Sequence, residues 1–243
     1  ILTSLGFQAL ATTSAGLAWS LGLPDGVGRI SRDVALANAR AICEATPLPV
    51  SADLENLYAH APEEAARTVP MAFAAGLAGC SIEDASGDPA DPIYPFELSV
   101  ARVKAAVDAA RALPAPLVIT ARAENLIHGR NDLEDTLRRL QAYAAAGADV
   151  LYAPGLVDLD SVRRVVAAVN KPVNVLVSGF NAHLTVDDLA AAGVRRISVG
   201  GALARAAMGE FIRSARGILE TGSFAYGARA ATMAEVEGLL RGA

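Results

Sequence analysis

The sequence of 243 residues has few cysteines, histidines, lysines and aromatic residues and no long hydrophobic run. Two cysteines, Cys43 and Cys80, are too few for a disulfide framework or a cysteine metal cluster, which favours a reducing, cytoplasmic compartment. A net charge of −5 with no basic run argues against a nucleic-acid or anionic-membrane partner. The longest weakly apolar stretch, Val69–Ile82, contains Pro70 and falls short of the ~20 residues that span a bilayer.

What the sequence does contain is a regular alternation of two kinds of segment. Short apolar or β-branched runs predict strands at Ala9–Thr13, Leu48–Asp53, Gly79–Ile82, Leu117–Ala121, Val150–Ala153, Val173–Val177 and Ile197–Val199. Between them, amphipathic spacing near 3.6 predicts helices at Arg32–Glu44, Pro62–Ala75, Phe96–Leu113, Leu133–Ala146, Leu159–Val169, Val186–Ala192 and Ala202–Glu220. Strict alternation of strand and helix implies parallel strands, because each connection must cross a face of the sheet.

Local signals support these boundaries and decide between two α/β architectures. Gly76, Gly147 and Gly193 each stand where a predicted helix ends, and Thr185 with Asp188 resembles a capping box. An open doubly wound sheet is expected to have a glycine fingerprint after its first strand, but Thr13 is followed there by Ser-Ala-Gly. Residues 1–243 therefore predict a single (β/α)8 TIM-type barrel domain.

Seven strands are predicted, one fewer than such a barrel needs. The opening segment Ile1–Phe7 resembles the end of a helix, so we expect the first barrel strand to have preceded Ile1.

Acidic and basic residues follow several predicted strands, where a barrel places its active site. Asp53 and Glu55 follow the second predicted strand, Glu83 follows the third and Arg122 follows the fourth. Carboxylates that converge in this way repel one another unless a cation binds among them. An oxygen-only donor set suits Mg²⁺, or Mn²⁺, rather than Zn²⁺. Arg122 is then free to bind a substrate carboxylate through two hydrogen bonds.

The same segments resemble the isocitrate lyase/phosphoenolpyruvate mutase superfamily, in order, from the first residues to about Gly201. The matching motifs are Thr12-Thr13-Ser14-Ala15-Gly16, Ser20-Leu21-Gly22-Leu23-Pro24-Asp25-Gly26, Ala52-Asp53-Leu54-Glu55, Ser81-Ile82-Glu83-Asp84 and Ala121-Arg122-Ala123-Glu124. The resemblance implies a Mg²⁺-dependent barrel enzyme that acts on a small 2-oxo or 2-hydroxy acid. It also implies a homodimer or homotetramer in which the C-terminal helices swap between subunits.

The resemblance also assigns roles to individual residues. Asp53 matches the carboxylate nearest the metal, Glu55 and Glu83 match acids that hold its water ligands, and Asp25 matches an outer acid. Thr13, Ser14 and Ala15 match the segment that binds the substrate carboxylate, and Arg122 matches the arginine that grips the substrate. Asn174, within the sixth predicted strand, adds a further polar contact. Asp53, Glu83 and Arg122 are the expected catalytic residues.

Three departures from the superfamily pattern narrow the expected chemistry. The loop from Ala85 to Tyr94 has no cysteine, histidine or lysine, so it lacks the Lys-Lys-Cys-Gly-His motif whose cysteine is the lyases' proton donor. The mutase's loop asparagine has no clear counterpart. Leu57-Tyr58-Ala59 stands where much of the family has Gly-Tyr-Gly. We therefore expect a short-loop member that cleaves a carbon–carbon bond, as a lyase or decarboxylase, through a metal-stabilised enolate, with an oxaloacetate-like substrate favoured.

Two other functions stay open from the sequence. Ser178-Gly179 and Gly200-Gly201 follow the sixth and seventh predicted strands, as in barrels that bind a sugar phosphate for isomerisation. Alternatively, the chain binds a 2-oxo acid with little or no turnover, which the absence of the lyase motif from its loop favours.

The loop Ser86–Pro95 also has two interpretations, either as a lid that excludes water or as a semi-rigid surface crossover.

Overall fold

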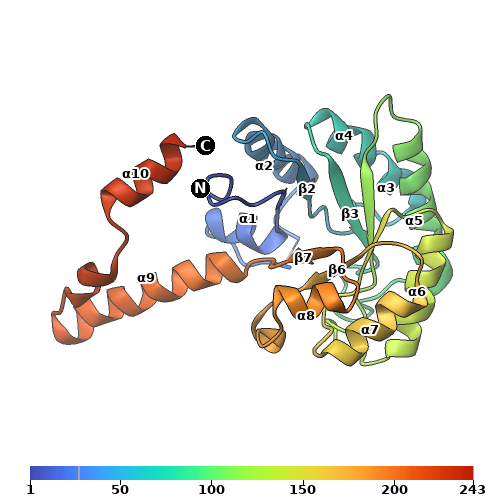
Figure 1. Cartoon of the computed structure of the whole chain (residues 1–243). Coiled ribbons are helices and arrows are strands. Elements are labelled where there is room, and N and C mark those ends of the chain that lie inside the picture. Colours follow the sequence, from blue (N-terminus) through green and yellow to red (C-terminus); the bar gives the residue numbers. More distant parts are fainter. Residues whose placement is uncertain (27, 243) are drawn as a thin grey trace.

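Parallel strands surrounded by helices make up the body of the chain in a computed structural model that describes residues 1–26 and 28–242 (Figure 1). All neighbouring strands pair in parallel and in sequence order, from β1 to β7. The strands are β1 (Leu10–Ala11), β2 (Val50–Ala52), β3 (Gly79–Glu83), β4 (Val118–Arg122), β5 (Val150–Tyr152), β6 (Val173–Leu176) and β7 (Arg196–Ser198). The seven strands form a nearly closed TIM-type barrel. It is not fully closed, because within the described residues no pairing joins β1 to β7. The predicted fold class is confirmed.

Helices follow the strands, and all but the last two cover the outside of the sheet (Figure 1). They are α1 (Ser14–Ser20), α2 (Arg32–Glu44), α3 (Pro62–Ala66), α4 (Thr68–Ala74), α5 (Phe96–Arg111), α6 (Leu133–Ala145), α7 (Leu159–Ala168), α8 (Val186–Ala191), α9 (Ala202–Thr221) and α10 (Met233–Arg241), with short 3₁₀ turns at Gly179–Asn181 and Ala225–Arg229. No described helix is both long and apolar enough to cross a membrane.

The predicted caps are present. Gly76, Gly147 and Gly193 adopt φ values of 89°, 101° and 87° after their helices. At the start of α8, the Asp188 amide donates to the Thr185 hydroxyl at 3.1 Å, and the Thr185 amide donates to the Asp188 carboxylate at 3.0 Å. This reciprocal pair is the capping box that the sequence predicts.

One predicted helix is wrong as a single element, because Pro62–Ala75 is divided at Arg67 into α3 and α4. Pro70 has no amide hydrogen to donate to the carbonyl of Ala66, and its ring crowds that carbonyl. The Thr68 hydroxyl donates instead to the carbonyl of Leu57 at 2.8 Å, which fixes the break against the preceding loop. Helix α1, which directly follows β1, was not predicted.

The opening segment has the geometry of a helix end. The Phe7 amide donates to the carbonyl of Leu2 at 3.2 Å, the Gly6 amide donates to that of Thr3 at 3.0 Å, and Gly6 has φ 88°. These two bonds around a left-handed glycine form a Schellman motif.

The main core lies between the sheet and the surrounding helices. It is built from strand residues such as Ile82, Ile119 and Leu151 and from helix residues such as Leu140 and Val165, all at most 1% exposed. Strands β3 and β4 approach closely at Gly79, where an added Cβ would lie 2.8 Å from the carbonyl oxygen of Val118. This core fixes the strand ends that carry the site.

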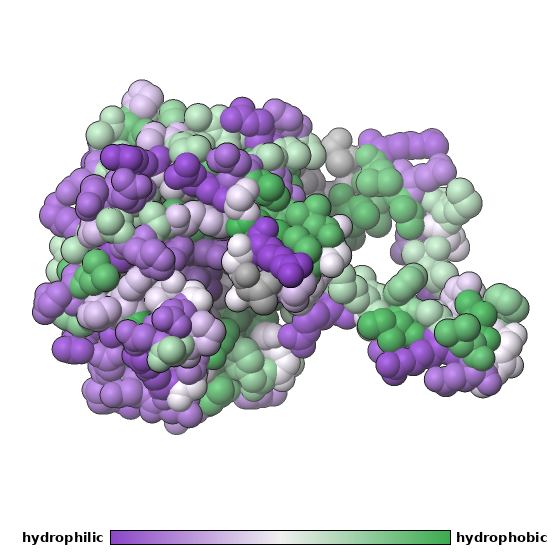
Figure 2. Space-filling view, turned by 180° about the vertical axis from the view of Figure 1, so that it is seen from behind, coloured by the Kyte–Doolittle hydropathy of each residue, from purple (hydrophilic) through white to green (hydrophobic). Residues whose placement is uncertain are grey.

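The last two helices are different, because they project from the barrel (Figure 1). Neither α9 nor α10 has a buried residue, although both are amphipathic. Their exposed apolar side chains include Phe211 at 73%, Leu219 at 86% and Met233 at 78%. Figure 2 shows apolar side chains gathered on this projecting arm.

Candidate active site

A single row of paired residues crosses the sheet from β3 to β7. Glu83 pairs with Arg122, Arg122 with Tyr152, Tyr152 with Asn174, and Asn174 with Arg196. Paired residues of adjacent strands point to the same face of a sheet. The fold therefore brings together side chains that lie more than a hundred residues apart in the sequence.

Arg122, at the end of β4, is surrounded by carboxylates. Its Nη1 lies 2.8 Å from Asp53 Oδ1, its Nη2 lies 3.2 Å from Glu83 Oε2, and its Nε lies 2.7 Å from Glu124 Oε1. The arginine side chain is 12% exposed and that of Glu124 is 4% exposed. One guanidinium thus faces three carboxyl groups, an excess of acids to which Glu55 adds.

The excess negative charge changes the ionisation of the buried acids. Burial, with the charges of Asp53 and Asp25, raises the pKa of Glu55 to about 7. Burial also raises the pKa of Glu83 well above its usual range, and the charges of Glu124, Asp53 and Glu55 add to this although Arg122 opposes it. The pKa of Glu124 is raised by burial as well. Such shifts indicate a place where additional positive charge is favoured.

The loop after β2 carries two of the predicted ligands and has an unusual backbone. Glu55, Leu57 and Tyr58 have φ values of 49°, 58° and 59°, a left-handed conformation that is rare without glycine. The Glu55 amide donates to Asp53 Oδ1 at 3.3 Å, and the Glu83 amide donates to the carbonyl of Glu55 at 3.0 Å. This chain reaches the left-handed conformation at three positions without glycine.

A buried arginine of α5 holds this loop in place. Arg102 is 1% exposed, and its guanidinium donates to the carbonyls of Asn56, Ala59 and His60. The guanidinium also lies over the ring of Tyr94, 4.4 Å from its centroid. Strained residues persist only where their surroundings over-determine them, and Arg102 supplies that constraint here.

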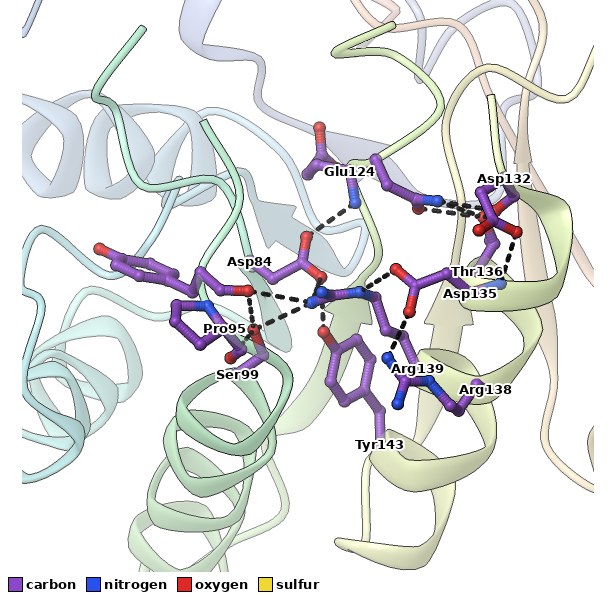
Figure 3. Close-up of polar contacts among 12 residues, drawn as sticks. Asp84, Pro95, Ser99, Glu124, Asp132, Asp135, Thr136, Arg138, Arg139 and Tyr143 are labelled. Atoms are coloured by element: carbon purple, nitrogen blue, oxygen red, sulfur yellow. Dashed lines mark hydrogen bonds and ion pairs between the residues drawn. The ribbon is translucent and has the colours of Figure 1, made fainter. Parts of the chain in front are cut away.

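Asp84 has a supporting role (Figure 3). Its Oδ2 accepts hydrogen bonds from Arg139 Nη1 at 3.0 Å and from the hydroxyl of Tyr143 at 2.6 Å, while its Oδ1 accepts from the Glu124 amide at 2.8 Å. All three of its neighbours, like Asp84 itself, are at most 5% exposed. Asp84 therefore joins the ends of β3 and β4 to α6 from behind the site.

A cavity of about 630 Å³ opens in front of Arg122. Of the sequence-predicted residues, Thr13, Ser14, Ala15, Asp25, Asp53, Arg122 and Asn174 line it. Glu55 and Glu83 do not line it and lie behind Asp53 and Arg122. Gly200 and Gly201 line the cavity, whereas Ser178 and Gly179 do not, so the two predicted phosphate-binding glycine segments do not meet there.

The loop Ser86–Pro95 is internally bonded and is not part of the cavity lining. An antiparallel bridge joins Ala85 to Ile93, and the Ser86 amide donates to the carbonyl of Pro92 at 2.8 Å. An ion pair of 3.1 Å between Asp91 and Arg130 attaches the loop to the connection after β4. This arrangement agrees with a semi-rigid crossover.

The donor chemistry of the acidic group fits a hard divalent cation. Among residues 1–26 and 28–242, no three His, Cys, Asp or Glu side chains surround a common point as a closed metal cage. Mg²⁺ does not require one, because it takes one or two carboxylates and keeps several water ligands. Asp53 faces the cavity, and the acids behind it have raised pKa values in the absence of a cation. The chemistry of these residues fits a hard divalent cation such as Mg²⁺.

Several residues of the site were not predicted as functional. Tyr152 and Arg196 line the cavity, and Arg102 holds the loop after β2. Tyr152 is the last residue of β5, as Arg122 is the last residue of β4. Its place at the carboxyl end of a strand is therefore the signal that could have identified it. Arg102 falls on the buried stripe of α5 between Ser99 and Val103. A charged residue on the buried face of this helix is the sequence signal that could have identified Arg102.

The fold and the site together define a TIM-type barrel with acidic residues and one arginine at the carboxyl ends of its strands. Residues 1–219 match the phosphoenolpyruvate phosphomutase family, and the chain belongs to that family.

Three relatives illustrate the range of this family. The 2-methylisocitrate lyase of Salmonella typhimurium strain LT2 is 36% identical over 199 residues, which cover 78% of this chain and 65% of that protein. An oxaloacetate decarboxylase of Rhodopseudomonas palustris strain BisB5 is 32% identical over 84% of this chain and 69% of its own length. A solved structure from Burkholderia cenocepacia J2315, provisionally classed as a lyase/mutase, is 51% identical with a TM-score of 0.93. It covers 98% of this chain and 84% of the solved one. The chain thus spans about two thirds of the length of the curated relatives.

Proposed function

We propose that this protein is a Mg²⁺-dependent enzyme that cleaves a carbon–carbon bond of a small 2-oxo or 2-hydroxy acid, with an oxaloacetate-like 2-oxo acid favoured. The observation that supports this most strongly is the excess of carboxylates around Arg122 at the edge of a cavity. Family membership supports the same class of reaction, because relatives include a 2-methylisocitrate lyase and an oxaloacetate decarboxylase.

The cation is assigned to the acidic side of the cavity. Asp53 is its direct ligand, while Glu55, Glu83 and Asp25 hold its water ligands. When bound, Mg²⁺ supplies the positive charge that polarises the 2-oxo group and stabilises the enolate formed on bond cleavage. Mn²⁺ is the expected substitute.

The substrate is assigned to the hydrogen-bond donors that line the cavity beside the acids, since Arg122 lies 2.8 Å from Asp53. Thr13, Ser14 and Ala15 contribute backbone amides and hydroxyl groups for the substrate's carboxylate. Arg122 binds a second oxygen and stabilises developing negative charge. Asn174 is 2% exposed and its Oδ1 has no hydrogen-bond partner among the described residues, so it is suited to accept a hydrogen bond from bound substrate or water.

A decarboxylation places the smallest demand on these residues. Carbon dioxide leaves without needing a proton, whereas cleavage of a 2-hydroxy acid also needs a base for the hydroxyl group. The semi-rigid loop Ser86–Pro95 brings no such group to the cavity. This comparison favours a 2-oxo acid over a 2-hydroxy acid.

The projecting helices support assembly of the protein into a homodimer or homotetramer. Phe211 and Leu219 of α9 are largely exposed, while Ile197 of β7 is 36% exposed and Val199, which follows β7, is 38% exposed. An amphipathic helix without its own core and an incompletely covered strand are complementary surfaces. We propose that α9 of one subunit covers the barrel of another.

Phe211→Asp is expected to lower the oligomer mass measured by sedimentation, while the matched change Glu220→Asp leaves it unaltered.

A turnover screen tests the proposed function. Purified protein is incubated with oxaloacetate, isocitrate or methylisocitrate, with Mg²⁺ or with a chelator, and products are identified by NMR. We expect cleavage of oxaloacetate that disappears with the chelator. Mg²⁺-dependent binding of these acids without any turnover would show a binding protein instead, and activity on sugar phosphates alone would favour a phosphate-binding isomerase.

A further inference from the structure

Formation of an enolate requires a later proton donor, and the cavity has few candidates. None of the cysteines, histidines or lysines of the described chain lines the cavity. The titratable side chains that do line it are Asp25, Asp53, Arg122, Arg196 and Tyr152. The donor that replaces the lyases' loop cysteine has to be sought among these five.

Four of the five are poorly suited to give up a proton at the reacting carbon. Asp25 and Asp53 are assigned to the cation side as carboxylates. Arg122 is held charged by three carboxylates, which raise the pKa of its guanidinium well above its usual range although burial opposes this. Arg196 reaches Thr120, with Nη1 3.5 Å from Oγ1, and Thr120 precedes Arg122 by two residues on the same strand. Its guanidinium therefore lies roughly 7 Å deeper, at ~3.3 Å per strand residue.

Tyr152 has the required position and orientation. It is the register partner of both Arg122 and Asn174, and the Arg122 guanidinium lies 5.0 Å from the centre of its ring. The substrate-binding arginine and the phenol therefore face the same part of the cavity.

Two polar side chains, Asn174 and Ser198, line the cavity together with Tyr152. Asn174 Nδ2 donates to Ser198 Oγ at 2.9 Å, so the hydroxyl hydrogen of Ser198 is free to be donated. Ser198 acts to lower the pKa of Tyr152, which favours the phenolate form. Because Tyr152 lines the cavity, its phenol can direct its O–H toward a bound ligand.

We propose that Tyr152 is the proton donor to the enolate carbon, an assignment that rests on the proposed carbon–carbon cleavage. For an oxaloacetate-like acid, the bond to the departing carboxylate breaks and its electron pair enters the enolate as carbon dioxide leaves. The enolate carbon then takes the phenolic proton, and the electron pair of the O–H bond stays on the Tyr152 oxygen. Arg122 and Ser198 stabilise this phenolate until a proton from solvent water restores the phenol.

The ionisation of Tyr152 agrees with this role. Burial raises the pKa of Tyr152 to about 12, while the charge of Arg122 and the side chain of Ser198 act in the opposite direction. The phenol is thus protonated before the reaction. An enolate carbon is a stronger base than a phenolate, so the transfer is favourable.

The first test is proton exchange into pyruvate, which is the reverse of this step and needs no knowledge of the natural substrate. Wild-type protein with Mg²⁺ in D₂O is expected to exchange the methyl protons of pyruvate, followed by NMR. Tyr152→Phe keeps the ring but is expected to slow exchange by about 100-fold, the usual contribution of a general acid or base. Oxalate affinity, measured separately with Mg²⁺, is expected to stay within about threefold, because the substrate contacts remain. Tyr226→Phe, on the projecting arm, is the matched control.

The second test separates bond cleavage from protonation. With oxaloacetate, carbon dioxide release and keto-pyruvate formation are followed together, the latter with lactate dehydrogenase. In Tyr152→Phe the keto product is expected to lag behind carbon dioxide, because the enol is protonated only after release.

The outcomes distinguish the two claims. An active wild type with an equally active Tyr152→Phe variant that shows no lag would overturn the assignment of Tyr152 alone. A wild type that binds oxalate with Mg²⁺ but neither exchanges pyruvate protons nor cleaves any acid would overturn the proposed function and this assignment with it.

Discussion

Replacement of Asp84 by asparagine tests whether the site depends on the buried polar cluster behind it. Asp84 accepts three hydrogen bonds, from Arg139, Tyr143 and the Glu124 amide. The asparagine side chain would have only one oxygen, so in either orientation its amide nitrogen faces at least one donor that it cannot satisfy. An unsatisfied buried donor costs about 1–3 kcal/mol, and breaking a buried ion pair costs about 3–5 kcal/mol. Because Arg139 keeps its 2.7 Å pair with Asp135, we expect a loss of about 3 kcal/mol.

Urea unfolding, followed by circular dichroism and tryptophan fluorescence, measures this change. Asp91→Asn is the matched control, because the same substitution there removes a pair with Arg130 in which Asp91 is 68% exposed. That pair is expected to contribute no more than about 0.5 kcal/mol. If Asp84→Asn destabilised the protein no more than Asp91→Asn does, the supporting role of Asp84 would be refuted.

Three further predictions concern the loop after β2, the acids and one helix end. Arg102→Met removes the donors to three loop carbonyls. Calorimetry is expected to show Mg²⁺ binding weakened about tenfold, as happens when the outer hydrogen-bond partners of a metal site are lost. Unchanged Mg²⁺ affinity would show that the loop is held without Arg102. The pKa of Glu55 is raised to about 7, above its unfolded value, so in metal-free protein stability falls as pH rises from about 4.5 to 7. Mg²⁺ affinity rises over the same interval and levels off above it, whereas a flat calorimetric pH profile would contradict the assignment of Glu55. Gly147→Ala places a Cβ 3.0 Å from Val107 Cγ1 at φ 101° and is expected to cost more than about 1 kcal/mol in urea unfolding, unlike Gly227→Ala in the exposed arm.

Most of the barrel follows from local sequence signals. The alternation of strand and helix, the glycines that follow α4, α6 and α8, and the Thr185–Asp188 box all predict elements that the structure confirms. The break at Arg67 was missed because the apolar spacing continues through it, although Pro70 removes one helical hydrogen bond. Helix α1 is too short for periodicity to be read from its sequence.

The candidate site was predictable where function depends on position along a strand. Asp53, Glu83 and Arg122 were found because they end or follow strands, and the structure brings them to one point. Tyr152 ends β5 but lies inside the predicted strand Val150–Ala153, so the rule did not identify it. The three hydrogen bonds of Arg102 could not be predicted, since they depend on how α5 packs against a distant loop.

Calorimetric titration with oxalate, an enolate mimic, tests the central claim most directly. Wild-type protein is predicted to bind oxalate with Mg²⁺ present and not with a chelator. The double variant Asp53→Ala/Glu83→Ala is predicted to lose this binding, while an Asp88→Ala/Glu237→Ala control, altered only at outlying surface acids, retains it. Oxalate binding that is independent of Mg²⁺, or that survives the loss of Asp53 and Glu83, would contradict the account.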